Sequence, residues 1–139
     1  MKDKLKILSQ EEMEESFLNE KCLKIEHLSL NTITSGKGKN HFFSYFVDGT
    51  IVAVLKLRTG QETMMFEGVF NSLNFVSVNS EYKNRGIASK LIDEMFLFLK
   101  KRGLGDVTIT GYEPEGLLYL PKKIEKSSKE YGITFHHII

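Results

Sequence analysis

The pattern of apolar and polar positions is clearest in one amphipathic segment near the middle of the chain. Between Gly86 and Arg102, apolar residues recur at the spacing of one helix face. This stripe consists of Ile87, Ala88, Leu91, Ile92, Met95, Phe96 and Leu99. Basic residues close the segment and Gly103 follows it, as is typical of a helix C-terminus. The pattern predicts a helix over residues 86–102.

Shorter aromatic and β-branched runs predict strands. Residues 42–47 and 50–58 are two such runs, joined by Asp48-Gly49. An Asp-Gly pair favours a tight hairpin turn, because both central residues of a type I′ turn have positive φ. Further strands are predicted at residues 73–78, 107–110 and 133–139.

Two more helices are predicted from their boundary residues. Ser9 and Glu12 have the spacing of a capping box, so a helix is expected over residues 10–23. A later helix is expected over residues 114–131, because Pro114 suits a first turn. Pro121 lies inside that span and predicts a kink or break.

The element order is therefore helix, hairpin, strand, helix, strand, helix, strand. Strands joined by a crossover helix are parallel, whereas hairpin strands are antiparallel. We expect an α/β (α+β) fold with a mixed, partly parallel twisted sheet flanked by helices. The length of 139 residues and the lack of a composition break favour one domain over residues 1–139.

Composition and charge narrow the function classes. The 19 basic and 18 acidic residues give a net charge of +1, which argues against nucleic-acid or anionic-membrane partners. Cys22 is the only cysteine, so no intramolecular disulfide can form. The four histidines are isolated, or adjacent within a predicted strand, so no metal site is expected. Without a signal-like or membrane-spanning run, a cytoplasmic location is expected.

The candidate chemistry lies where a strand runs into the long helix, at residues 76–88. The first N–H groups of a helix lack intrahelical acceptors, and the helix dipole adds positive potential there. Gly86 permits close approach of a ligand to the backbone, while Lys83 and Arg85 add charge. The segment predicts a phosphate-binding site. A tight strand-to-helix bend without a ligand is the alternative.

The spacing Lys83-x-x-Gly86-x-Ala88 resembles the Arg/Gln-x-x-Gly-x-Gly/Ala pyrophosphate loop of the GNAT superfamily of acyl-CoA-dependent N-acyltransferases. The resemblance covers roughly residues 42–131 and implies a GNAT-like fold that binds acetyl-CoA as co-substrate. Lys83 departs from the usual Arg or Gln, and Ala88 from the commoner glycine. The implied cofactor-binding residues are Val76, Ser77, Val78, Lys83, Asn84, Arg85, Gly86, Ile87, Ala88 and Ser89.

The resemblance also implies a catalytic tyrosine that protonates the departing thiolate. Tyr119 stands at its position, although Tyr112 replaces the asparagine that often precedes it by seven residues. A core role for Tyr119, among leucines, is equally compatible with the sequence. Glu67 is the acid nearest upstream of the binding strand and reads as solvated, so no general base is assigned.

Two functions follow from the resemblance. The first is an N-acetyltransferase that moves an acetyl or short acyl group from the CoA thioester to a small-molecule or peptide amine, within a ternary complex. The second is an inactive acetyl-CoA-binding sensor. Family members usually end in a two-strand hairpin, whereas one strand follows the last helix here, so a shortened C-terminus is expected. An unpaired edge at residues 133–139 favours a homodimer.

Overall fold

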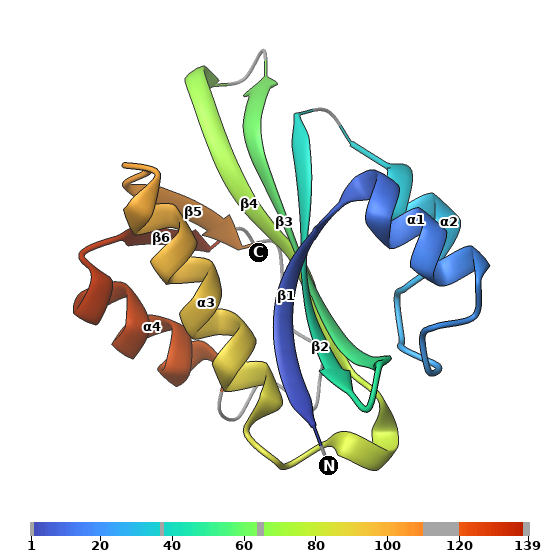
Figure 1. Cartoon of the computed structure of the whole chain (residues 1–139). Coiled ribbons are helices and arrows are strands. Elements are labelled where there is room, and N and C mark those ends of the chain that lie inside the picture. The colour runs from blue at the N-terminus through green and yellow to red at the C-terminus, as the bar shows by residue number, and fades with distance from the viewer. Residues whose placement is uncertain (1, 37, 64–65, 110–119, 138–139) are drawn as a thin grey trace.

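Six strands form one mixed sheet in the computed structural model, which describes residues 2–36, 38–63, 66–109 and 120–137 (Figure 1). The strands lie side by side in chain order. They are β1 (Asp3–Ser9), β2 (Lys39–Val47), β3 (Thr50–Thr63), β4 (Phe66–Val78), β5 (Asp106–Ile109) and β6 (Thr134–His137). Neighbours from β1 to β4 are antiparallel, whereas β4 with β5 and β5 with β6 are parallel. The predicted mixed, partly parallel sheet is confirmed.

Helices cover both faces of this sheet. They are α1 (Gln10–Leu18), α2 (Leu30–Thr34), α3 (Ile87–Lys101) and α4 (Leu120–Tyr131), with a 3₁₀ turn, η1 (Ser80–Tyr82). Figure 1 shows α1 and α2 against one face and α3 and α4 against the other. None of the helices in the described ranges combines the length and hydropathy needed to cross a bilayer.

Each face of the sheet has its own apolar cluster, because side chains alternate along strands. Residues from β2 and β3 pack with α3 on one face, including Phe43, Leu55, Leu91, Met95 and Phe96. The other face packs α1 and α2 through a smaller cluster that includes Met13, Ile33, Phe42 and Val54. Full burial of one such side chain contributes roughly 1.5–3 kcal/mol. These clusters fix both helical layers to the sheet.

The strongest local predictions are confirmed. β2 and β3 pair as a hairpin, with φ of 49° at Asp48 and 83° at Gly49, both positive as a type I′ turn requires. Ser9 accepts a hydrogen bond from the Glu12 N–H at 3.2 Å, and Glu12 accepts one from the Ser9 N–H at 3.0 Å, which is the predicted capping box. The amphipathic segment forms α3 with six buried residues.

Several elements differ from the predictions; for example, β2 begins before residue 42 and β3 continues past residue 58. The charged segment before Ser9 forms β1, paired along β2, where no strand was predicted. α1 ends at Leu18 rather than residue 23, because the chain then extends beside β3 and Leu23 N–H donates to Ile51 O at 2.9 Å. β4 begins at Phe66, before the predicted residue 73. α4 is described over Leu120–Tyr131 and includes Pro121 as its second described residue. Residues 114–119, where this helix was predicted to begin, lie outside the described ranges.

Candidate functional site

β4 and β5 share a short ladder. In the described chain, they pair only through Ser72 with Thr108 and Leu73 with Ile109. β4 nevertheless continues to Val78, still paired on its other side with β3. Beyond Leu73, the β5-facing edge of β4 therefore has no partner strand in the described residues.

The register decides which main-chain groups point to that edge. Asn79 N–H donates to Val52 O at 2.8 Å, which makes this a hydrogen-bonded pair of the antiparallel ladder. Hydrogen-bonded and non-hydrogen-bonded pairs alternate, so Ser77 also bonds towards β3. Val76 and Val78 occupy the other positions. Their N–H and C=O groups therefore point away from β3, towards the side on which β5 lies.

A β-bulge sits where β4 and β5 diverge. Lys56 pairs with Phe75, and Leu57 pairs with Leu73, so Asn74 is an extra residue in β4. A bulge increases local twist and bends its strand. The bulge thus lies one residue past the last pair with β5.

The turn after β4 is anchored by Asn79, which is 8% exposed. Its side-chain oxygen accepts from Glu81 N–H at 2.9 Å, while its amide nitrogen donates to Lys24 O at 2.8 Å. The first contact starts η1, and the second ties the turn to the segment between α1 and α2. The loop that follows leaves from a fixed point.

The loop before α3 has alternating backbone handedness. Asn84 and Gly86 have φ of 64° and 76°, with Arg85 between them on the ordinary side of the map. Such alternation turns successive N–H groups towards one side, as in anion-binding nests. All three residues are exposed. The Arg85 guanidinium lies over the Tyr82 ring, 4.9 Å from its centroid.

The first turn of α3 has backbone amides without a side-chain cap. Gly86 is the N-cap residue and makes no side-chain cap hydrogen bond, while its C=O accepts from Lys90 N–H at 3.1 Å. The Ile87 side chain is buried, and Ala88 packs against the apolar cluster on the sheet face that α3 covers. Ser89 is half-buried. The amides at this helix start are therefore available to an external anion.

The structure brings most of the predicted binding segment to one junction. Val76, Ser77 and Val78 end β4, and residues 83–89 form the adjacent loop and helix start. Tyr119 and Tyr112 lie outside the described residues. Glu67 belongs to β4, but its side chain is not described.

Sequence reasoning missed a pair of cations on β3. Lys56, 2% exposed, donates from Nζ to the carbonyl oxygens of Thr32 and Ser35, the latter at 3.1 Å. Arg58 donates from Nε to Asn74 Oδ1 at 3.0 Å. Burial, with a contribution from Arg58, lowers the pKa of Lys56 to about 8, and burial lowers the pKa of Arg58. The sequence did contain a signal for this pair. Two cations stand two residues apart in an otherwise apolar predicted strand, a spacing that puts both side chains on the same face.

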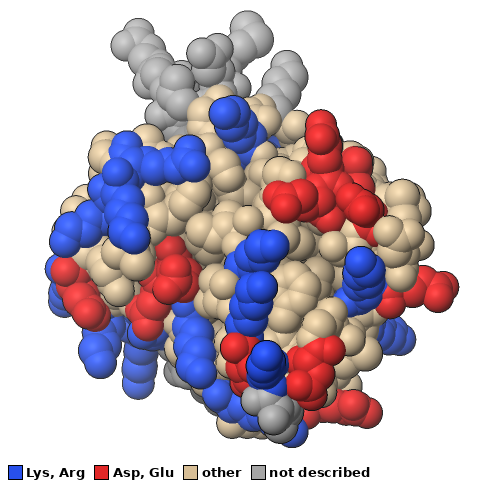
Figure 2. All heavy atoms as spheres, in the orientation of Figure 1, with Lys and Arg blue, Asp and Glu red and all other residues tan. Residues whose placement is uncertain are grey.

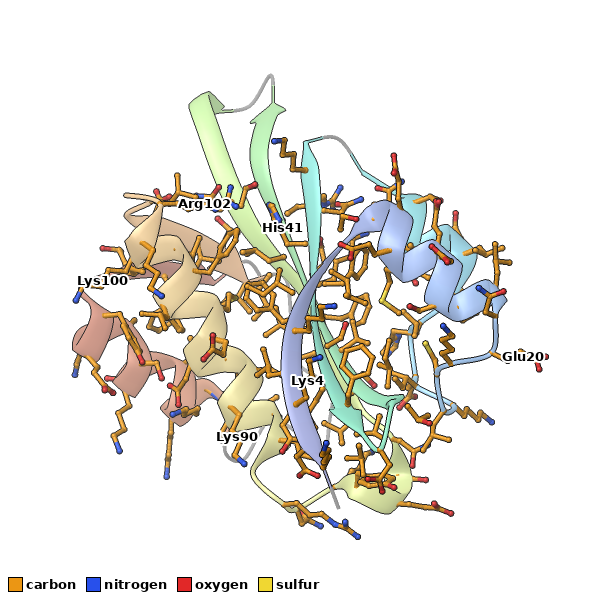
Figure 3. All side chains as sticks on the ribbon, in the orientation of Figure 1. Lys4, Glu20, His41, Lys90, Lys100 and Arg102 are labelled. Atoms are coloured by element: carbon orange, nitrogen blue, oxygen red, sulfur yellow. The ribbon has the colours of Figure 1, made fainter. Side chains whose placement is uncertain are left out.

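The pKa values of His41 and Cys22 are also shifted, but both residues lie away from this junction. Burial, then Arg102 and Lys39, lowers the pKa of His41 to about 4, and burial raises the pKa of Cys22 to about 11. Figure 3 shows His41 and Arg102 near the C-terminal end of α3, where both line a cavity of about 490 Å³. That end is opposite the Gly86 loop. The described side chains contain no group of three or more potential metal ligands of the His, Cys, Asp and Glu types.

The surface charge is mixed on the face seen in Figure 2. Lys and Arg side chains alternate with Asp and Glu side chains there, and neither sign covers the whole face. This distribution agrees with the near-neutral net charge of +1.

Known proteins resemble this chain in sequence pattern and in fold. The model of the acetyltransferase (GNAT) family matches residues 5–114. The comparison with curated proteins found no match. An aminoglycoside acetyltransferase from an uncultured soil metagenomic sample is 14% identical with a TM-score of 0.63, over 99% of this chain and 96% of that one.

Two further solved structures show the same fold. A ribosomal-protein-alanine N-acetyltransferase from Brucella melitensis is 14% identical with a TM-score of 0.60, over 89% of this chain and 91% of that one. An aminoglycoside N-acetyltransferase in complex with CoA is 12% identical with a TM-score of 0.57, over 99% of this chain and 91% of that one. With a family model that matches most of its residues, the chain belongs to the GNAT acetyltransferase family.

Proposed function

We propose that this protein is an N-acetyltransferase that transfers an acetyl or short acyl group from acyl-CoA to an amine, by direct attack within a ternary complex. The observation that carries the proposal is the junction of β4 and α3. The start of α3 has amides without a side-chain cap, and its first residue, Ile87, belongs to the apolar cluster against which Val76 and Val78 pack. The main-chain groups of these two valines point away from β3. Family membership and a related structure in complex with CoA support the choice of ligand.

The pyrophosphate of CoA would bind at the start of α3. The amides from residue 83 to Ser89 would donate to its oxygens, where the helix dipole favours negative charge. Gly86 takes the left-handed conformation that this loop requires, with φ of 76°. Lys83 and Arg85 would add positive charge.

The pantetheine arm would lie along β4. Its amides would pair with the N–H and C=O groups of Val76 and Val78 as an added strand, with Ser77 facing β3. This pairing would bring the thioester near the point where β4 and β5 diverge. A main-chain N–H there would stabilise the oxyanion that forms when the amine attacks.

Proton transfers complete the proposed reaction. The amine nitrogen attacks the carbonyl carbon, the carbon–sulfur bond breaks, and the thiolate takes a proton. We propose Tyr119 as the donor of that proton, and solvent as the acceptor of the proton from the amine. Positioning of the two reactants supplies much of the rate.

Calorimetric titration with acetyl-CoA, followed by thiol release against a panel of amines, tests the proposal. We expect binding of one acetyl-CoA per chain and release of free thiol with at least one amine. Binding without release for every amine would favour the sensor function. Absence of binding would remove both functions.

A further inference from the structure

Lys56 and Arg58 form a pair of cations on one face of β3. They alternate with apolar residues, so both side chains lie on the face covered by α1 and α2. Among the described side chains, which do not include those of residues 61–70, no ion pair joins either of them to a carboxylate. Each positive charge is thus partly removed from water without a counter-charge from a described side chain.

The direction of the pKa shifts of the two groups supports this description. Burial, with a contribution from Arg58, lowers the pKa of Lys56 to about 8, and burial lowers the pKa of Arg58. A carboxylate partner would act in the opposite direction, because it favours the charged form of a cation. The region around the pair therefore retains uncompensated positive potential.

The two cations differ in how their donors are used. Lys56 Nζ has three protons and three acceptors, namely Thr32 O, Ser35 O and Ser35 Oγ. Arg58 has five donors, of which Nε–H bonds to Asn74 Oδ1 at 3.0 Å. Arg58 is thus the better candidate for binding an external group, because its fork matches carboxylate and phosphate oxygens.

The guanidinium of Arg58 is held in place from two sides. Asn74 holds Nε, and Gly36 lies against Nη1, since a Cβ at Gly36 would lie 1.6 Å from that nitrogen. A side chain whose position is fixed in this way loses less conformational entropy when it binds a ligand. Arg58 is therefore pre-organised.

Its position relative to the proposed reaction is also defined. Asn74 is the bulge residue one step past the last β4–β5 pair, and it precedes Val76 by two residues, which is roughly 7 Å along a strand. Under the proposed function, the thioester lies near this divergence. A small acceptor that placed its amine there could reach Arg58 with another group.

We infer that Arg58 binds an anionic group of the acceptor, so that the substrates of this site are amines that also carry a carboxylate or a phosphate. This inference rests on the proposed function. Arg58 is a specificity-determining residue, and Asn74 positions it. Because such a contact is charge-assisted, we expect about 10–100-fold preference for anionic acceptors.

Matched pairs of primary amines test this preference. β-Alanine is compared with β-alaninamide, and O-phosphoethanolamine with ethanolamine, so that the two pairs separate carboxylate from phosphate. We expect at least one anion to have a KM roughly 10-fold or more below that of its neutral counterpart. Equal KM values within both pairs would overturn the inference.

Three substitutions assign any preference to Arg58. Arg58→Gln should abolish it, Arg58→Lys should keep part of it, and Asn74→Asp should weaken it by placing a carboxylate beside the guanidinium. Lys100→Gln removes one exposed charge at the far end of α3 and should behave as wild type. Retention of the preference in Arg58→Gln would show that another residue binds the anion.

Calorimetry separates this inference from the proposed function. We expect Arg58→Gln to leave the Kd of acetyl-CoA unchanged; an equal loss of acetyl-CoA affinity would instead place a co-substrate phosphate at Arg58 and overturn the inference. If the protein neither binds acetyl-CoA nor acetylates any amine, the anion site can still be tested on its own. The melting temperature is then measured with inorganic phosphate and with β-alanine, at matched ionic strength. Stabilisation that Arg58→Gln removes supports an anion site, and no shift overturns it.

Discussion

Lys56 Nζ donates a hydrogen bond of 3.1 Å to the main-chain oxygen of Ser35, at the C-terminal end of α2. The last carbonyls of a helix lack intrahelical donors and carry the negative end of its dipole. A buried ammonium therefore stabilises a helix of only five residues. Gly36 follows directly, so Lys56 also fixes the segment against which Arg58 packs.

Replacement of Lys56 should loosen this segment. Lys56→Met keeps an apolar side chain of similar length but leaves the carbonyls of Thr32 and Ser35 without their donor. We expect a loss of about 1–3 kcal/mol in the free energy of unfolding at neutral pH, measured by urea denaturation. Lys4→Met, at an exposed position of β1, is the control and should change little. Equal effects of the two substitutions would contradict this role.

The same pair of proteins gives a pH test. The pKa of Lys56 is about 8 in the folded chain and 10.5 as a reference value, so between these values the unfolded state binds more protons. Stability contributed by this group then rises with pH across that range. The free energy of unfolding of the wild type, minus that of Lys56→Met, should increase from neutral to alkaline pH. A constant difference would contradict the lowered pKa.

A negative charge at the start of α3 should block the proposed pyrophosphate site. Ser89 is the third residue of α3, where glutamate favours the helix by about 0.3–1 kcal/mol. Ser89→Glu should therefore keep or raise the melting temperature while it weakens acetyl-CoA binding about 10-fold or more. Asn31→Glu adds the same charge at an exposed position of α2 and should leave the Kd unchanged. Unaltered affinity of Ser89→Glu would exclude this binding mode.

Tyr119 can be tested by removal of one oxygen. If its hydroxyl protonates the thiolate, Tyr119→Phe should lower kcat by about 100-fold or more, with the Kd of acetyl-CoA unchanged. Tyr131→Phe is the matched control, because the Tyr131 ring stacks on Phe96 with centroids 6.4 Å apart. Similar kcat values for the two variants would assign Tyr119 to the core instead.

Asp93 joins α3 to α4. Its carboxylate accepts hydrogen bonds from Lys123 Nζ and Ser127 Oγ, both at 2.9 Å, and Ser127 is fully buried. Asp93→Ala should cost about 1–2 kcal/mol of unfolding free energy, because it leaves a buried hydroxyl without its partner. Glu125→Ala removes the exposed pair with Lys129 and should cost less than about 0.5 kcal/mol. Equal costs would show that the Asp93 contacts add little.

The elements that the sequence predicted are those whose signals are local. α3 has a long apolar stripe, and the β2–β3 hairpin has a turn dipeptide that demands positive φ. β1 escaped prediction because its lysines suit an exposed edge strand and hide the alternation. α2 escaped because part of its stability comes from Lys56, which is distant in sequence.

The same distinction between local and distant signals applies to the candidate site. The loop before α3 was predictable, because Gly86 and its neighbours are close together in the chain. The bulge at Asn74 depends on how β4 pairs with β3, and the contact of Arg58 with Asn74 depends on that bulge. Neither is visible without the neighbouring strand. The effect of burial on the pKa of Lys56 likewise required the helical layer above it.

The short ladder between β4 and β5 has a mechanical consequence. Within the described chain, the antiparallel half of the sheet is connected to the parallel half by two residue pairs and by one hydrogen bond, from Asn71 Nδ2 to Asp106 O at 3.1 Å. Side chains packed on α3 add to this connection. The parallel half can therefore open as a separate cooperative unit, at a lower free energy than global unfolding. A ligand bound across the boundary between β4 and β5 would stabilise the contact between the two halves. Ligand binding should therefore slow amide hydrogen exchange in β5.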